Sequence, residues 1–180
     1  MISYNKVLEI FKKTKINIKN EIVSSKYAVN RISASNITSP NNYPAANNTA
    51  FDGFAINSKE TNKLSKKNIK QFKIIKVLAA GDNPKIKKIQ KFSSIEVMTG
   101  AIIKKPFDTV IPIEKIKFYP SKKKPKYIII NNKIKKNNHI RFSGSDYKKG
   151  QKIINKGQII QPNHILAFKT LGIEKILVKK

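Results

Sequence analysis

The chain has 180 residues, no cysteine, and 38 Lys and Arg against 10 Asp and Glu, which gives a formal net charge of +28. This length suffices for one substantial core or two small lobes, and the lack of cysteine excludes disulfides and thiolate metal sites. No apolar run approaches the roughly 18 residues of a membrane-spanning helix, and the N-terminus lacks a signal-peptide core. We therefore expect a soluble, cytoplasmic protein.

The positive charge comes almost wholly from lysine, because arginine occurs only at positions 31 and 141. Proteins that read nucleic-acid sequence rely on the planar, bidentate guanidinium of arginine, and the lysines here are dispersed. Lys, Asn and Ile share A/T-rich codons, so an A/T-rich genome accounts for the abundance of all three. We favour this interpretation over specific nucleic-acid binding, and a basic polyanion-binding protein remains the weaker alternative.

Two helices are expected near the N-terminus. Apolar side chains recur at helical spacing within residues 4–14: Tyr4, Val7, Leu8 and Phe11. The pattern predicts an amphipathic helix with one buried stripe, and Ser3 is placed to cap it. A second short helix is expected at residues 25–31, after which Pro40 and Pro44 favour an extended chain.

The middle of the chain is predicted to be mainly β. Four runs are rich in β-branched residues and bounded by Gly, Pro, Asp or Asn: 72–78, 94–98, 109–113 and 126–131. The polar segment 57–71 indicates a surface loop or a poorly ordered helix.

The last 30 residues predict a short strand at 152–155, a helix that begins at Pro162 and ends before Gly172, and a closing strand at 173–178. The sum is an α+β, mainly β chain with a few short helices. We expect residues 1–46 together with 140–180 to form a mixed α/β lobe, and residues 47–139 to form an inserted, mainly β lobe.

Four clusters of small and polar residues interrupt the apolar runs: 48–53, 79–82, 98–101 and 141–146. In the first, Gly53 would allow a sharp bend that presents Asp52, although an ordinary Asp-Gly hairpin turn is the commoner structure. In the third, Thr99 and Gly100 could bind an oxyanion through a hydroxyl and N–H groups, or simply form a strand-end turn.

The fourth cluster holds Arg141, a natural bidentate partner for a phosphate or a similar anion. Asp146 could hold a cation or move protons, as could Asp52, or it could simply pair with Arg141. His139 and His164 lack metal-ligand spacing, and we interpret them as structural or surface residues.

In this order, the clusters resemble the N-terminal region of the molybdopterin molybdenumtransferase family, which includes the gephyrin E domain. The segments that carry the resemblance are 48–55, 79–82, 98–101, 110–114, 141–146, 149–150 and 162–173. The resemblance implies coiled, bifurcated β-sheets with an inserted barrel-like lobe, and a homodimer. It also implies insertion of molybdate into adenylylated molybdopterin with Mg²⁺.

By resemblance, Asp52 and Thr99 would be the catalytic residues. The implied substrate-binding residues are Asn48, Gly100, Arg141 and Asp146. No metal ligand can be assigned from the sequence, and neither can the carboxylate that would contact a cation.

The chain departs from the family pattern at Ser145, where the family has Glu, and at Phe142, where it has a second arginine. The family's pterin-binding α/β domain, which follows the closing strand, is absent from this sequence. We therefore expect the chain to supply one wall of an active site, with a pterin-binding C-terminal domain acting in trans. The alternative is a non-catalytic dimerisation or scaffold remnant of that enzyme.

Overall fold

The computed structural model describes residues 2–15 and 17–180, and it divides into two units. The terminal unit joins Met1–Pro40 to Gly150–Lys180, and the inserted unit is the intervening segment Asn41–Lys149. The domain division expected from the sequence has the same nested order with boundaries at 46/47 and 139/140, and it stays a prediction.

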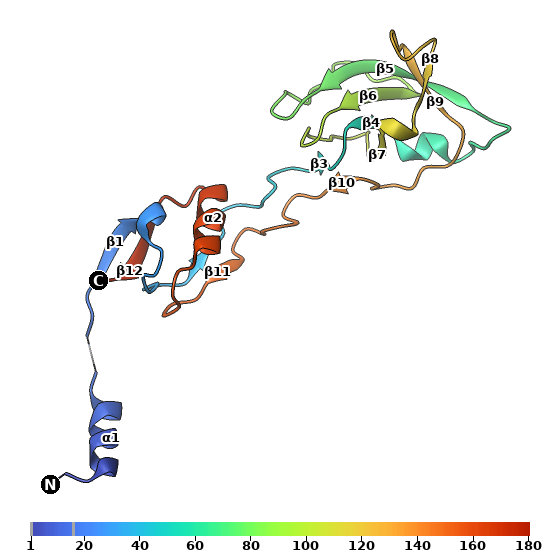
Figure 1. Cartoon of the computed structure of the whole chain (residues 1–180). Helices are drawn as coiled ribbons and strands as arrows, with labels where there is room; N and C mark the ends of the chain where they lie inside the picture. Colours follow the sequence, from blue (N-terminus) through green and yellow to red (C-terminus); the bar gives the residue numbers. More distant parts are fainter. Residues whose placement is uncertain (1, 16) are drawn as a thin grey trace. The chain divides into compact units, whose positions relative to one another are not determined.

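Two small antiparallel sheets and one helix form the core of the terminal unit (Figure 1). β1 (Asn20–Ser24) pairs with β12 (Lys175–Lys179), and β2 (Ile37–Thr38) pairs with β11 (Lys152–Ile154). α2 (Pro162–Thr170) and these strands contribute side chains to one apolar cluster. The buried members of this cluster are Ala28, Ile37, Ile154, Ile160, Phe168, Ile176 and Val178.

The C-terminal helix begins and ends where the sequence predicts. Pro162 takes the first helical position, where its missing N–H costs no helical hydrogen bond. The N–H of Gln161 donates to Nδ1 of His164 at 2.9 Å, so this histidine has a structural role. Gly172 follows the helix with φ +71°, a conformation that favours glycine. The neighbouring predicted strands, 152–155 and 173–178, are also confirmed, with small shifts at their ends.

The N-terminal helix is capped as predicted but is not buried as predicted. α1 (Tyr4–Lys13) begins after Ser3, whose Oγ accepts the N–H of Lys6 at 3.4 Å. No residue of α1 is buried, and Tyr4 and Phe11 are 76% and 71% exposed. The expectation of a buried stripe is therefore wrong for the described chain. Capping and periodicity define a helix, but burial requires a surface to cover its apolar face.

The other helical elements are short. The helix predicted at 25–31 is a single 3₁₀ turn, η1 (Ser25–Tyr27). It could not have reached residue 31, because Asn30 takes φ +65° and cannot belong to a right-handed helix. No helix within the described residues is long and apolar enough to cross a membrane.

A curled six-stranded sheet forms most of the inserted unit (Figure 1). The strands lie in the order β7 (Thr109–Pro112), β4 (Gly53–Ile56), β6 (Ser93–Val97), β5 (Lys70–Leu78), β9 (Tyr127–Ile130) and β8 (Lys117–Tyr119). Neighbouring strands are antiparallel except for β5 and β6, which are parallel. The four strands predicted between residues 72 and 131 are confirmed as β5, β6, β7 and β9.

β4 and β7 are buried on both faces of the sheet, which explains their almost continuous apolar runs. In β4, Phe54 and Ile56 belong to one apolar cluster and Ala55 belongs to the other. Val110 and Ile111 of β7 divide between the two clusters in the same way. The curled half-barrel agrees with the predicted barrel-like lobe, and the chain is α+β and mainly β, as predicted.

The polar segment 57–71 is more closely packed than the sequence indicates. It contains the 3₁₀ turn η2 (Ser58–Thr61), and both end residues of this turn are buried. The Asp108 carboxylate accepts the N–H of Ser58 at 2.7 Å and its hydroxyl at 3.0 Å. These bonds supply the partners that a buried polar turn needs, so the expectation of a surface loop or poorly ordered helix is wrong at this turn.

A short ribbon crosses the inserted unit beside the large sheet. β3 (Asn48–Thr49) pairs with β10 (Ile140–Arg141), and Asn48 also forms an isolated bridge with Ile102. The 3₁₀ turn η3 (Ile113–Lys115) follows β7. The pairings of β3 bring the polar clusters at 48–53, 98–101 and 141–146 next to one another.

Candidate functional site

The most specific contact among the predicted site residues joins Asp52 to Thr99. One carboxylate oxygen of Asp52, Oδ1, accepts the main-chain N–H of Thr99 at 2.6 Å and its hydroxyl at 2.7 Å. Both residues are exposed. The two residues are far apart in the sequence, so this contact is a product of the fold and fixes the direction of the carboxylate.

These two hydrogen bonds change the acidity of the carboxyl group. The Thr99 hydroxyl bond, followed by the Thr99 N–H bond, holds the pKa of Asp52 below its ordinary value of 3.8. Both bonds favour the ionised form. Asp52 is therefore a carboxylate at neutral pH, and no hydrogen bond between described residues engages its other oxygen, Oδ2.

The glycine beside Asp52 acts by its small size. Gly53 is the first residue of β4, and a Cβ atom there would lie 2.1 Å from the main-chain oxygen of Ile111 on β7. Its φ is not in the left-handed region, so the expected glycine bend is corrected to a close approach of two strands. The hairpin alternative is also wrong, because β3 pairs with β10 whereas β4 pairs with β6 and β7.

A threonine that the sequence analysis did not single out shapes the loop before Asp52. Thr49 is 1% exposed, and its Oγ1 donates to the carbonyl of Phe51 at 2.6 Å and accepts the Phe51 N–H at 3.2 Å. The ring of Phe51 contacts His139 edge-on at 4.8 Å, and the carbonyl of His139 accepts the N–H of Ala50. Threonine commonly bonds its own backbone two residues further on, which is the signal that could have identified it.

The main-chain N–H groups of Thr99 and Gly100 are already bonded to other parts of the protein. Gly100 has φ +86°, and its N–H donates to the Thr49 carbonyl at 2.9 Å. The Thr99 N–H already binds Asp52. The expectation that Thr99 and Gly100 offer N–H groups to an oxyanion is therefore corrected, because this loop binds the protein's own carboxylate. Gly100 adopts a left-handed backbone conformation that favours glycine, and its predicted role in substrate binding stays a prediction.

The second polar cluster supports this loop. The Asp82 carboxylate accepts the Ala79 N–H at 2.8 Å and so closes its own turn, in which Gly81 has φ +90°. A Cβ atom at Gly100 would lie 3.3 Å from Cβ of Ala80. The two loops are thus neighbours, and Asp82 has a structural role.

Arg141 and Asp146 form the ion pair that the sequence analysis named as an alternative to ligand binding. Nη2 of Arg141 contacts Oδ2 of Asp146, and the Ser145 hydroxyl donates to Oδ1 of Asp146 at 3.1 Å. The guanidinium lies 5.8 Å from the ring centre of Tyr43. Arg141 also sits directly opposite Asn48 in the β3–β10 pairing. An incoming anion would have to share this arginine with Asp146.

The six predicted site residues therefore form two groups joined by β3. One group is Asp52, Thr99 and Gly100, and the other is Asn48, Arg141 and Asp146. Among residues 2–15 and 17–180, no group of three or more His, Asp or Glu side chains is placed to hold a metal ion. The roles assigned to these residues stay predictions.

Comparison with known proteins identifies the family. Residues 2–172 match the family model described as "MoeA N-terminal region (domain I and II)". Molybdopterin molybdenumtransferase of Bacillus subtilis (strain 168) is 26% identical over 160 residues, which are 89% of this chain and 37% of that protein. The protein of the same name from Staphylococcus aureus (strain N315) is 29% identical over 159 residues, which are 88% and 36% of the two chains.

Solved structures show the same relationship. Two structures of the molybdopterin biosynthesis MoeA protein from Pyrococcus horikoshii superpose with TM-scores of 0.88 and 0.85, at 26% and 28% identity. Each match covers 99% of this chain and 44% or 46% of the other. The chain thus spans less than half the length of these relatives. It belongs to the MoeA N-terminal region family.

Proposed function

We propose that the chain works in molybdenum cofactor biosynthesis, as the N-terminal part of an enzyme that inserts molybdate into adenylylated molybdopterin. Its contribution is one wall of the active site, with Asp52 and Thr99 as the catalytic pair. The observation that carries this proposal is an exposed carboxylate held in one direction by two hydrogen bonds from a single threonine. Membership of the MoeA N-terminal region family is the reason to assign this carboxylate to molybdate insertion.

Asp52 suits the role of a fixed negative charge better than that of a proton acceptor. Its lowered pKa makes it a weak base at neutral pH, so proton abstraction would have little driving force. Its Oδ2 atom is the natural ligand for Mg²⁺, which proteins often hold through one or two carboxylates together with substrate phosphates. Mg²⁺, when bound, would offset the negative charge of those phosphates.

The second group would bind the anionic parts of the substrates, molybdate and the phosphates of the pterin nucleotide. Arginine has five N–H donors in a planar fork, and the contact with Asp146 uses the Nη2 end of Arg141. Asn48, directly across the ribbon, adds amide donors on a neighbouring position. The net charge of +28 would raise the local concentration of such anions.

The proposal includes two partners: a pterin-binding domain supplied in trans and a second copy of the chain. A single open wall of exposed residues cannot exclude water from the reaction, so a further surface is needed to enclose it. The exposed apolar side chains of α1 (Tyr4–Lys13) offer surface that association could cover. Sedimentation of the purified chain tests the homodimer, which a monomer at micromolar concentration would contradict.

Reconstitution with the pterin-binding domain of a relative, added separately or fused, tests the proposed activity through the molybdenum bound to the pterin product. We expect Asp52→Asn to lower the rate about a hundredfold, in the range seen when one preorganised electrostatic contact is lost. Glu174→Gln, at an exposed carboxylate in the terminal unit, makes the same change of charge and should leave the rate unaltered. Equal rates for wild type and Asp52→Asn would contradict the proposal.

A non-catalytic scaffold is the second candidate, and the Arg141–Asp146 contact favours it. Asp146 offsets the charge of the arginine, and Phe142 and Ser145 stand where the family resemblance leads us to expect charged residues. A scaffold would bind the pterin-binding domain with equal affinity in wild type and Asp52→Asn, and neither form would support molybdenum insertion.

A further inference from the structure

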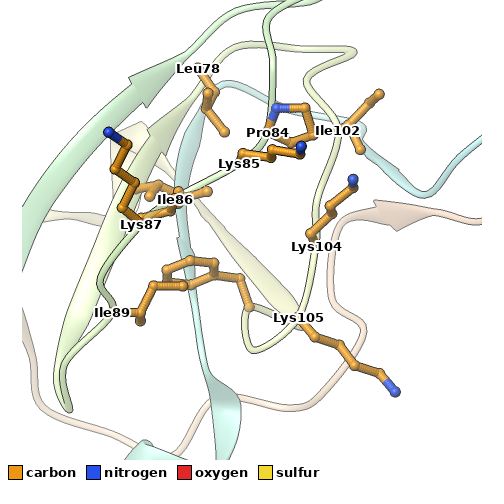
Figure 2. A pocket seen from close by; sticks show the side chains of 11 residues that line it. Leu78, Pro84, Lys85, Ile86, Lys87, Ile89, Ile102, Lys104 and Lys105 are labelled. Atoms are coloured by element: carbon orange, nitrogen blue, oxygen red, sulfur yellow. The ribbon is translucent and has the colours of Figure 1, made fainter.

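A pocket in the inserted unit combines an apolar floor with a lysine rim (Figure 2). Its volume is about 290 Å³. Leu78, Ile95 and Phe107 are buried members of the apolar cluster beneath it, and Ile86 and Ile89 pack on that cluster from the loop above. None of the six predicted site residues lines this pocket.

The loop that forms one wall of the pocket is fastened to the sheet. Nζ of Lys76, on β5, donates to the carbonyl of Asn83 at 2.8 Å and to that of Lys85 at 3.2 Å. The Asn83 side chain accepts the N–H of Lys85 at 3.0 Å. The opposite wall continues from Ile102, which is tied to β3 by its bridge with Asn48. Hydrogen bonds to the backbone therefore hold the walls of the pocket in place.

The charge around the pocket has one sign. No Asp or Glu lines the pocket, whereas four lysines do: Lys85, Lys87, Lys104 and Lys105. None of these lysines takes part in an ion pair among the described residues. In Figure 2 the amino groups of Lys85 and Lys104 point to one side of the pocket, near Ile102, whereas Lys87 and Lys105 extend away from it.

We propose that this pocket binds a small monocarboxylate with an apolar body. The carboxylate would lie between the amino groups of Lys85 and Lys104, and the apolar body would cover Ile86, Ile89 and Phe107. A volume of about 290 Å³ falls at the lower end of the range for small-molecule pockets, so the occupant is a compact molecule. The inference does not depend on the molybdenum-related function proposed above.

Two features of the pocket argue for this ligand class. An apolar floor gains free energy when it is covered by an apolar body, and an uncompensated lysine pair gains from a single negative charge. A bare inorganic anion would leave the floor exposed, and a neutral apolar molecule would gain nothing from the exposed ammonium groups, which would stay hydrated. A ligand with both an apolar body and one negative charge would contact the apolar floor and the lysine rim together.

Titration of 4-phenylbutyrate into the full chain, followed by the methyl NMR signals of Ile86, Ile89 and Ile102, tests the proposal. Two matched probes separate the contributions: 4-phenylbutanamide lacks the charge, and acetate lacks the apolar body. We expect saturable shifts of these methyl signals with 4-phenylbutyrate. 4-phenylbutanamide should bind about three- to tenfold more weakly, as the loss of an exposed charged contact allows. Acetate should give no saturable shift, because it has almost no apolar area to bury.

Paired charge variants separate a built site from general attraction to a cationic protein. K85A/K104A and K87A/K105A each remove two charges at exposed positions of the same rim. We expect K85A/K104A to weaken 4-phenylbutyrate binding about three- to tenfold, and K87A/K105A to change it by less than about twofold. Equal weakening by both pairs, or the absence of methyl shifts in the wild-type chain, would overturn the proposal.

Discussion

Replacement of Gly53 by alanine tests whether this glycine is needed for space. A Cβ atom at position 53 would lie 2.1 Å from the Ile111 carbonyl oxygen and 3.0 Å from Cα of Pro112, against about 3.4 Å for an ordinary contact. Both obstacles are main-chain atoms, so no side-chain rotation relieves the clash. β4 and β7 would have to separate by about 1 Å, which weakens their mutual hydrogen bonds.

The cost follows from these contacts. Overpacking of a well-packed core costs about 1–3 kcal/mol, and each weakened backbone hydrogen bond adds about 1 kcal/mol. We therefore expect Gly53→Ala to lower the free energy of unfolding by about 3 kcal/mol or more, measured by urea denaturation. The signals of Asp52 and Thr99 should shift with it, because Asp52 precedes the displaced residue.

Gly81→Ala is the matched control in the same unit. Gly81 has φ +90°, and a Cβ atom there would meet nothing within 4 Å, so only backbone strain of about 1–2 kcal/mol is expected. A loss at Gly53 equal to or smaller than the loss at Gly81 would refute the close-approach explanation.

Three other contacts should each have a measurable effect. Burial raises the pKa of Glu60 above its ordinary value of 4.5. The protonated side chain therefore stabilises the fold below pH 4.5, and this stabilisation is lost as pH rises through the folded-state pKa. Glu60→Gln should remove this pH dependence from the midpoints of urea denaturation. Thr49→Val should cost about 1–3 kcal/mol, because the Phe51 N–H loses its acceptor. Asp146→Asn should tighten molybdate binding in calorimetry if Arg141 binds anions, and unchanged affinity would contradict that role.

The sequence predicts the elements of this fold better than it predicts how they pair. β-branched runs indicate strands such as 109–113, and Pro162 and Gly172 mark the ends of a helix through local chemistry. The parallel pairing of β5 with β6 depends on contacts across the whole inserted unit, and no local pattern encodes it. The stripe of α1 shows the opposite problem, because periodicity indicates an apolar face whether or not the described chain covers it.

The candidate site divides in a similar way. Asp52 and Thr99 stand out as polar residues beside glycines, and the family resemblance joins them, but their two hydrogen bonds appear only in the fold. Gly53 is required by the backbone of β7, which is distant in the sequence, so the residues next to Gly53 indicate a bend instead. The sequence does not predict the lysine-rimmed pocket, because lysine is so common throughout this chain that four lysines do not mark a site.

Thr99 holds Asp52 as a directed, ionised carboxylate, and an NMR titration of the Asp52 carboxyl carbon tests this arrangement most directly. We expect a pKa below 3.8 for Asp52 in the wild-type chain and a rise toward 3.8 in Thr99→Val, which keeps the main-chain N–H but loses the hydroxyl bond. A wild-type pKa at or above 3.8, or one that Thr99→Val leaves unchanged, would contradict it.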